Sequence, residues 1–416
     1  MRIDIVETDL FINYLSDALK VDNLSSVNGI TTDSRLVKKN DLFLALKGEH
    51  FDGSDFIDQA FSNGATYVIS QSINENQNVF TVDDVVEFIG KICSIWMNNF
   101  QGKTIAITGS NGKTTTKDLI SHVLTKCGNN VSKTKGNFNT SIGVPLTIFS
   151  FSNDPSQTYV VELGANQVGD INYLSSIIKP DIGIVTNISD AHLEGFGSMD
   201  NIRKEKKSIF KHSKKHYYGK KIDTSMNLLN HPLQNNKVFL KNASIAYEVC
   251  KDFMSIDDKQ DFSTIIEDFT LPKGRGQVYN LSTNSFLIDD TYNASPSSFK
   301  AAIDAFRLFP GEKILVAGDM RELGSESKKF HKAVGEYAAK SGIQKLWAVG
   351  DLSQHMAKAF GPQAKHFASM DELVNECRLT ARPNLVFLIK GSRGSRMEIV
   401  ANELSTARRS NAGLVV

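Results

Sequence analysis

Short apolar runs alternate with amphipathic stretches along most of the chain. In the first hundred residues, runs at 41–46 and 65–69 predict strands, and one apolar face over 85–97 predicts a helix. Three later runs are each followed by a helix-like stretch, and they cover residues 104–107, 159–163 and 182–186. This alternation is typical of a parallel, doubly wound sheet that holds ligands at the carboxyl ends of its strands.

The pattern changes twice further along the chain. Residues 204–241 are rich in lysine and asparagine and show little periodicity, so they predict no clear element. From residue 274 strands and helices alternate again, with apolar runs at 285–288, 313–317, 346–349 and 385–389. We therefore predict an α/β protein of three domains. These are residues 1–100, a central domain at 101–273 with a P-loop-type parallel sheet, and a domain at 274–416 with a Rossmann-like sheet.

Composition narrows the class of protein. The chain has 416 residues, 41% of them hydrophobic, and a formal net charge of +1, which argues against a nucleic-acid binder that works by phosphate neutralisation. No segment approaches the roughly 18 apolar residues of a membrane span, and the N-terminus lacks the apolar run of a signal peptide. Cys93, Cys127, Cys250 and Cys377 lie far apart, as expected for reduced thiols. We expect a cytoplasmic protein.

The strongest chemical signal is the sequence TGSNGKTTT at residues 108–116. It joins an apolar strand to a helix that we expect over 117–127, ended by Gly128. Backbone N–H groups exposed by glycines, with one lysine, at a helix N-terminus form a site for nucleotide phosphates. The standard phosphate loop has a further glycine where Ile107 stands here, so a chance match is the alternative.

Polar residues also follow the next two strands of the predicted central sheet. Glu162 ends one, and Asn187 and His192 follow the other. Parallel strands end at one edge, so these side chains are expected beside the loop, where Thr114 and Glu162 offer the hard oxygens that magnesium prefers. The alternative is a solvated acid at a strand end and a surface histidine.

The loop resembles that of the Mur ligases, the ATP-dependent amide-forming enzymes of bacterial peptidoglycan synthesis, whose loop also lacks the first glycine. The resemblance covers most of the chain in order. It includes TDSR (32–35), LKGEHFDG (46–53), GNFNTSIGVPLT (136–147), VELGAN (161–166), AHLEGF (191–196), DDTYNASP (289–296), GDMRELG (318–324) and KGSR (390–393).

The resemblance implies an ATP site and two magnesium ions. The implied ATP-binding residues are Thr108, Gly109, Ser110, Asn111, Gly112, Lys113, Thr114, Thr115, Asn242, Arg275, Asp290, Tyr292 and Asn293. Thr114 and Glu162 would ligate one magnesium, and His192 would help to hold the second. Lys206 matches a lysine that is carbamylated in this family and would act with the metal, because a carbamate attracts magnesium and an ammonium repels it. The implied catalytic residues are Lys113, Glu162, His192 and Lys206.

The implied reaction joins D-alanyl-D-alanine to UDP-N-acetylmuramoyl-tripeptide through an acyl phosphate. The first domain would bind the UDP-sugar, the central domain ATP, and the third the dipeptide. The implied substrate-binding residues are Ser34, Arg35, Lys47, Asn137, Asn139, Lys390 and Arg393. We expect a monomer with no nucleic-acid partner.

The sequence also departs from the family pattern. The adenine-binding motif survives only at Asn242 and Ala243, a usual histidine is Ser54, and the central domain is shortened after Lys206. Two alternatives therefore stay open. One is a sister ligase that adds a single amino acid, or a folylpolyglutamate-type ligase. The other is a non-catalytic paralogue that binds muramoyl nucleotides.

Overall fold

The structure is a computed structural model that describes residues 1–48, 51–190, 193–223, 236–251, 253, 259–282 and 284–411. The chain forms two compact units. One consists of Met1–Gly109, Ile120–Val185 and Lys204–Tyr218, and the other of Ser110–Leu119, Thr186–Arg203 and Gly219–Val416.

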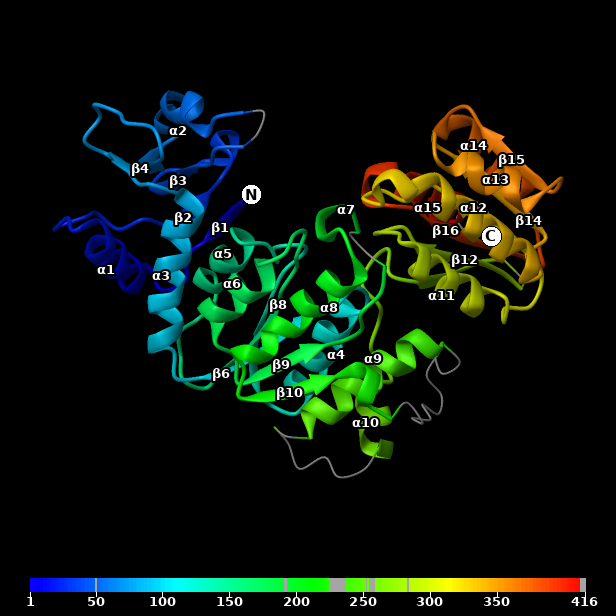
Figure 1. Cartoon of the computed structure of the whole chain (residues 1–416), viewed down its shortest axis with the longest axis horizontal. Coiled ribbons are helices and arrows are strands. Elements are labelled where there is room, and N and C mark those ends of the chain that lie inside the picture. Colours follow the sequence, from blue (N-terminus) through cyan, green and yellow to red (C-terminus); the bar gives the residue numbers. More distant parts are fainter. Residues whose placement is uncertain are drawn as a thin grey trace. The chain divides into compact units, whose positions relative to one another are not determined.

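The first sheet lies near the N-terminus (Figure 1). Its strands, in spatial order, are β1 (Arg2–Asp4), β2 (Gly29–Thr31), β3 (Asp41–Ala45), β4 (Ala65–Ser70) and β5 (Val79–Thr81). All neighbours are parallel except β1 and β2. The accompanying helices are α1 (Thr8–Leu19), η1 (Ser34–Leu36), η2 (Gly53–Phe56), α2 (Ile57–Ser62) and α3 (Val85–Asn99). Phe43, Ala60 and Val68 pack in the core that α2 closes.

The second sheet is fully parallel, with the order β10-β9-β6-β8-β7. Its strands are β6 (Lys103–Thr108), β7 (Asn130–Lys133), β8 (Gln157–Glu162), β9 (Ile182–Val185) and β10 (Lys215–Tyr218). Its segments also include α5 (Gly143–Phe149), α6 (Asp170–Ile178), α7 (Leu193–Phe196), α8 (Met199–Lys207), η3 (Ser208–Lys211) and η4 (Gly219–Lys221). The central strand β6 carries Ile105 and Ile107, both fully buried. The prediction that these strands form a parallel sheet is confirmed.

Helix α4 (Lys113–Lys126) follows β6 and begins four residues before its predicted start, inside the glycine-containing loop. Its end is as predicted. Gly128 adopts a φ of +84°, and the N–H groups of Gly128 and Asn129 donate to the carbonyls of Thr125 and Leu124.

The lysine-rich stretch contains more regular structure than its sequence pattern indicated. Strand β10 pairs in parallel with β9, and α9 (Lys237–Cys250) begins near the end of the stretch. Lys215 and His216 are exposed, so this edge strand carries no apolar run that could reveal it. Asn236 caps α9 by accepting from the N–H groups of Val238 and Phe239, and α10 (Lys259–Ile265) follows.

The third sheet has the order β11-β12-β16-β13-β14-β15 and is parallel except at β11. Its strands are β11 (Gln277–Ser282), β12 (Ser285–Asp290), β13 (Glu312–Ala317), β14 (Lys345–Val349), β15 (Ala364–Phe367) and β16 (Leu385–Lys390). Its helices are α11 (Pro296–Phe306), η5 (Gly324–Glu326), α12 (Ser327–Lys340), α13 (Ser353–Phe360), α14 (Met370–Thr380), η6 (Arg393–Ser395) and α15 (Glu398–Asn411).

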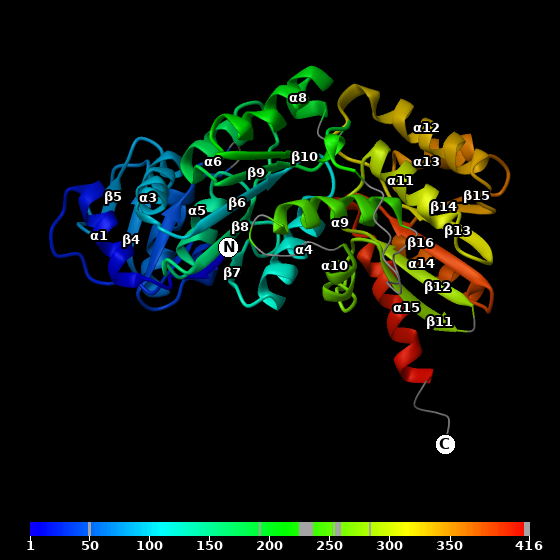
Figure 2. The ribbon, with the colours of Figure 1, turned by 90° about the horizontal axis from the view of Figure 1, so that it is seen from below.

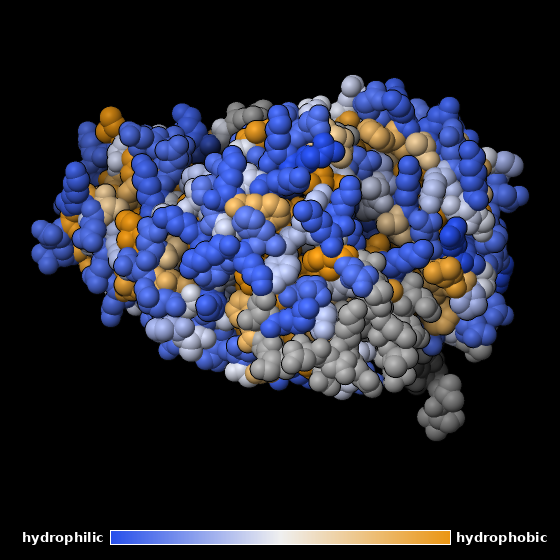
Figure 3. Space-filling model, turned by 60° about the horizontal axis from the view of Figure 1, so that its bottom comes forward, coloured by the Kyte–Doolittle hydropathy of each residue, from blue (hydrophilic) through white to orange (hydrophobic). Residues whose placement is uncertain are grey.

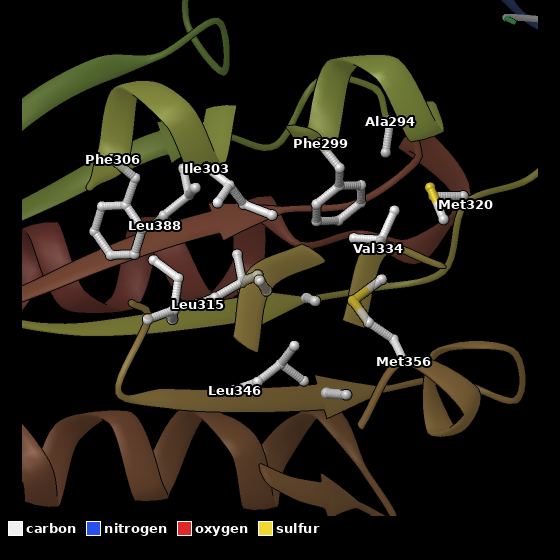
Figure 4. Packing of buried hydrophobic residues seen from close by; sticks show 14 of the residues in the cluster. Ala294, Phe299, Ile303, Phe306, Leu315, Met320, Val334, Leu346, Met356 and Leu388 are labelled. Carbon is white, nitrogen blue, oxygen red and sulfur yellow. The ribbon is translucent and has the colours of Figure 1, made fainter. Parts of the chain in front are cut away.

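Helices cover both faces of this third sheet (Figure 2). Phe299 of α11, Val334 of α12 and Met356 of α13 pack in one core (Figure 4), whereas Leu373 of α14 and Val400 of α15 pack in the other. The connections that leave β12 and β13 therefore run to the face opposite the one reached from β16, which lies between them. Ligand crevices form where the connections from neighbouring strands run to opposite faces of the sheet.

The α/β prediction is confirmed, and the limits of the three domains stay a prediction. In the described part of the chain no helix is both long and apolar enough to cross a membrane. Hydrophilic side chains cover most of the face in Figure 3, with apolar residues in small separate groups. All four cysteines are free thiols, as predicted.

Candidate active site

The loop between β6 and α4 needs its glycines for backbone geometry. Gly109 and Gly112 have φ values of +149° and +83°. A Cβ atom on Gly112 would also lie 2.5 Å from Oδ1 of Asn242 in α9, so α9 approaches the loop backbone directly. Lys113 is the first helical residue. The loop thus presents N–H groups and a cation at the positive end of α4.

The segment after β9 fixes the shape of this loop. The N–H groups of Ser110 and Asn111 donate to O and Oδ1 of Asn187, at 3.0 and 2.7 Å. Ser110 Oγ accepts from the Ser189 N–H at 2.9 Å, and Thr186 Oγ1 donates to Asn111 O at 2.6 Å. Asn187 therefore lies at the loop, as its position after a strand predicted. Ser189 carried no sequence signal.

Glu162 lies at the carboxyl edge of the sheet, beside the end of β6. It pairs in register with Ile107 and is 2% exposed. Nδ2 of Asn139 donates to its Oε1 at 2.8 Å, and the Glu162 N–H donates to Thr134 Oγ1 at 2.9 Å. Gly164 fixes Asn139 in turn by donating its N–H to the Asn139 carbonyl at 2.7 Å. Asn139, predicted from the resemblance to bind substrate, thus orients the predicted metal ligand.

Burial distinguishes three neighbouring lysines of α8. Lys206 is 1% exposed, whereas Lys204 and Lys207 are exposed. Burying an ammonium is costly unless other groups compensate its charge, and a solvated basic helix face would expose all three side chains. The position predicted for the carbamate is therefore the buried one of the three. His192, the other predicted metal residue, lies outside the described residues.

Five predicted residues gather around the third sheet and the loop. Lys390, 2% exposed, donates to Asp290 Oδ2 at 2.7 Å and to Asn293 O at 2.9 Å. Burial raises the pKa of Asp290, and Lys390 opposes this shift. The Arg275 guanidinium lies 3.8 Å from the ring centre of Tyr292, and its Nη2 donates to Thr114 Oγ1 at 3.0 Å.

Other predicted residues lie apart from these contacts. Arg393 is exposed, and its Nη1 lies 3.6 Å from Glu398 Oε1. Asn137 is exposed two residues before Asn139. Thr108 is fully buried at the end of β6, and Thr115 is 7% exposed in the first turn of α4.

The predicted substrate residues of the first sheet differ in exposure. Ser34 is 6% exposed, and its Oγ donates to Gln59 Oε1 at 2.6 Å, so it ties η1 to α2. Arg35 is exposed and forms two bonds to the Asp33 carboxylate, which lower the pKa of Asp33 to about 2. Lys47 is also exposed, 3.7 Å from Asp52 Oδ2.

Comparison with known proteins gives the class. Three models of one family match consecutive parts of the chain. They are the Mur ligase family catalytic domain at residues 26–95, the Mur ligase middle domain at 107–281 and the Mur ligase glutamate ligase domain at 274–393. A sequence relative at 32% identity, covering 91% of the chain, supports the same assignment. The chain belongs to the Mur ligase family.

That relative is the UDP-N-acetylmuramoyl-tripeptide–D-alanyl-D-alanine ligase of Escherichia coli K12, of which 94% is covered. Among solved structures, MurF from Acinetobacter baumannii matches with a TM-score of 0.81 at 26% identity, over 95% of this chain and 98% of that one. MurF from Thermotoga maritima in complex with ADP matches with a TM-score of 0.78 at 27% identity, over 92% of this chain and 98% of that one.

Proposed function

We propose that this protein is an ATP-dependent ligase that joins D-alanyl-D-alanine to UDP-N-acetylmuramoyl-tripeptide in peptidoglycan biosynthesis. The observation that carries the proposal is similarity to a ligase of this name along 91% of the chain. The glycine-dependent loop between β6 and α4 supports ATP as the phosphoryl donor, and the solved relative with ADP agrees with it.

The loop residues would bind the ATP phosphates, with Lys113 on the β- and γ-phosphates. Thr114 and Glu162 supply a hydroxyl and a carboxylate, which fit magnesium. The described residues contain no cluster of three or more His, Cys, Asp or Glu that could hold a metal ion. Magnesium, when bound, would neutralise charge on the phosphates. Arg275 donates to Thr114 and stacks on Tyr292, so it can contact the same phosphates.

The reaction has two steps. A carboxylate oxygen of the tripeptide attacks the γ-phosphorus, the bond to the β-phosphate oxygen breaks, and ADP leaves. The amine of D-alanyl-D-alanine then attacks the acyl carbon of the acyl phosphate, loses a proton and expels inorganic phosphate. Lys113 stabilises the charge that moves onto the oxygen between the β- and γ-phosphates, which leaves as a terminal oxygen of ADP. The domains exclude water that would otherwise hydrolyse the acyl phosphate.

Lys206 would carry a carbamate that orients the second magnesium with His192. Lys206 is the buried lysine of the three on α8, which supports this role. A carbamate there would present an anion to bound metal, whereas an ammonium would repel it. Arg35, Lys47, Asn137 and Asn139 would contact the UDP-sugar. We also propose that the protein is cytoplasmic. We further propose that it is a monomer, and sedimentation of the purified protein would test this oligomeric state.

One assay tests the function. Purified protein with Mg-ATP and UDP-N-acetylmuramoyl-tripeptide should release phosphate only when D-alanyl-D-alanine is added, and mass spectrometry should show the pentapeptide product. Phosphate release with a single amino acid would identify a sister ligase. Binding of the UDP-sugar with no turnover would identify a non-catalytic paralogue.

A further inference from the structure

Two turns at the carboxyl ends of β13 and β16 are tied together by hydrogen bonds. The Gly318 N–H donates to Lys390 O at 2.8 Å, and the Ser392 N–H donates to Asp319 O at 2.9 Å. The Arg321 N–H donates to Ser392 Oγ, also at 2.9 Å. The backbone of Arg321 is therefore fixed to the turn that follows β16.

The Arg321 guanidinium lies beside Gly394. Its neighbour Met320 is fully buried in the core at the end of β13 (Figure 4), whereas Arg321 is exposed. A Cβ atom on Gly394 would lie 2.7 Å from Nη1 of Arg321 and 2.8 Å from its Cζ. The guanidinium thus lies against the Gly394 backbone, in space that any other residue would fill.

The charge of Arg321 sets it apart from its basic neighbours. Lys390 pairs with Asp290 and Arg393 with Glu398, but no carboxylate among the described residues forms an ion pair with Arg321. An exposed guanidinium with no acid paired to it can form two parallel hydrogen bonds to a planar anion such as a carboxylate.

The position in the fold is one where ligands bind. β13 continues to α12 on one face of the sheet, and its neighbour β16 continues to α15 on the other. Arg321 lies at the carboxyl end of this pair, where the two connections separate.

We propose that Arg321 binds the C-terminal carboxylate of the incoming dipeptide and that Gly394 keeps its place open. The inference rests on the proposed function and deepens it. The amine of the dipeptide must stay unbound to attack the acyl phosphate. The carboxylate is then the charged group left to hold the substrate and to decide which end enters first. A phosphate group of ATP is the other anion that could use this guanidinium.

The test compares D-alanyl-D-alanine with its C-terminal amide in steady-state kinetics. Loss of a charge-assisted hydrogen bond should raise the KM for D-alanyl-D-alanine about 10- to 100-fold in Arg321→Gln. The KM values for ATP and the UDP-sugar should stay unchanged. The unsubstituted enzyme should prefer the free acid over the amide by a similar factor, and Arg321→Gln should lose this preference. Arg321→Lys should recover part of it.

Two further variants separate charge from position. Gly394→Ala retains the arginine but displaces it, so it should also weaken dipeptide binding. Arg307→Gln, which removes an exposed arginine after α11 near Asp304, should behave as the unsubstituted enzyme. An Arg321→Gln enzyme that keeps its preference for the free acid would overturn the inference alone. A rise in the KM for ATP instead would assign the guanidinium to phosphate. An unsubstituted enzyme inactive with D-alanyl-D-alanine would overturn the proposed function and this inference together.

Discussion

At the scale of single residues, the orientation of the Glu162 carboxylate depends on one amide. Asn139 donates to Oε1 at 2.8 Å and is itself fixed by Gly164. Groups that orient a metal ligand typically contribute about 10- to 100-fold to activity or metal affinity. We therefore expect Asn139→Ala to lower kcat by about that factor and to raise the magnesium concentration needed for half-maximal rate, both measured by phosphate release.

The control for this substitution is two residues away. Asn137 is exposed, so Asn137→Ala should leave the magnesium dependence unchanged even if it weakens binding of the UDP-sugar. Equal magnesium curves for Asn139→Ala and the unsubstituted enzyme would show that Glu162 does not need this amide.

Lys206 offers a second residue-scale prediction, with two matched controls on the same helix. Lys206→Ala should abolish turnover, and a small carboxylate such as acetate should restore part of it by replacing the carbamate. Lys204→Ala and Lys207→Ala remove exposed lysines and should retain turnover. Full activity in Lys206→Ala would show that the carbamate is placed at the wrong residue.

At the scale of elements, His331 joins α12 to the turn after β13. Its Nδ1–H donates to Ser327 O at 2.7 Å, and its Nε2 accepts from the Met320 N–H at 2.9 Å, so the ring is neutral. Burial lowers its pKa. The neutral, buried His331 ring stabilises the folded state fully above the ordinary histidine pKa of about 6.5. This stabilisation is lost as the pH falls from there through the lowered folded-state value.

We therefore expect the free energy of unfolding to fall by up to about 1.4 kcal/mol per pH unit from this residue between pH 6.5 and the lowered folded-state pKa, measured by urea denaturation. His331→Gln should remove that part of the pH dependence. His216→Gln, on an exposed histidine of β10, should retain it. Identical pH profiles for the two variants would show that His331 is not responsible.

The predictability of the elements depended on how each one is buried. Strands β9 and β16 are fully buried, and β6 is buried after Lys103. The apolar runs of these three strands were predicted to within about two residues. Strand β10 was not predicted, because it lies at a sheet edge and its residues do not alternate between apolar and polar. The start of α4 was misplaced because its first turn is the polar loop itself.

The same reasoning separates the parts of the site. Gly112 and Lys113 belong to a short sequence pattern that is typical of phosphate-binding loops, so the sequence alone indicated their role. The bonds from Asn139 to Glu162 and from Ser189 to Ser110 join positions far apart in the chain. Nothing in local spacing encodes them. Only the register of the strands and the paths of the following loops bring these side chains together.

At the scale of the whole molecule, two tryptophans report on different parts. Trp96 is fully buried in α3, and Trp347 is 2% exposed in β14. They belong to different compact units, and each unit contains a buried hydrophobic cluster of its own. Proteins built in this way often unfold in more than one step. The fluorescence of Trp96→Phe should therefore follow the unit with the third sheet, and that of Trp347→Phe the other unit.

We expect the urea midpoints from tryptophan fluorescence to differ between these two variants. Circular dichroism, which follows the whole chain, serves as the comparison. ATP without magnesium, at 100 times its Kd, should stabilise the unit whose loop it binds by about 2.7 kcal/mol. Magnesium is left out because its proposed ligands Thr114 and Glu162 belong to different units. The loop residues Ser110–Leu119 share a unit with Trp347, so the transition seen in Trp96→Phe should move to higher urea. UDP-N-acetylmuramoyl-tripeptide should instead move the transition seen in Trp347→Phe, because its predicted contacts Arg35, Lys47 and Asn139 share a unit with Trp96. Coincident midpoints that move together with either ligand would show that the chain unfolds as one cooperative body, and the assignment of each substrate to its own unit would lose this support.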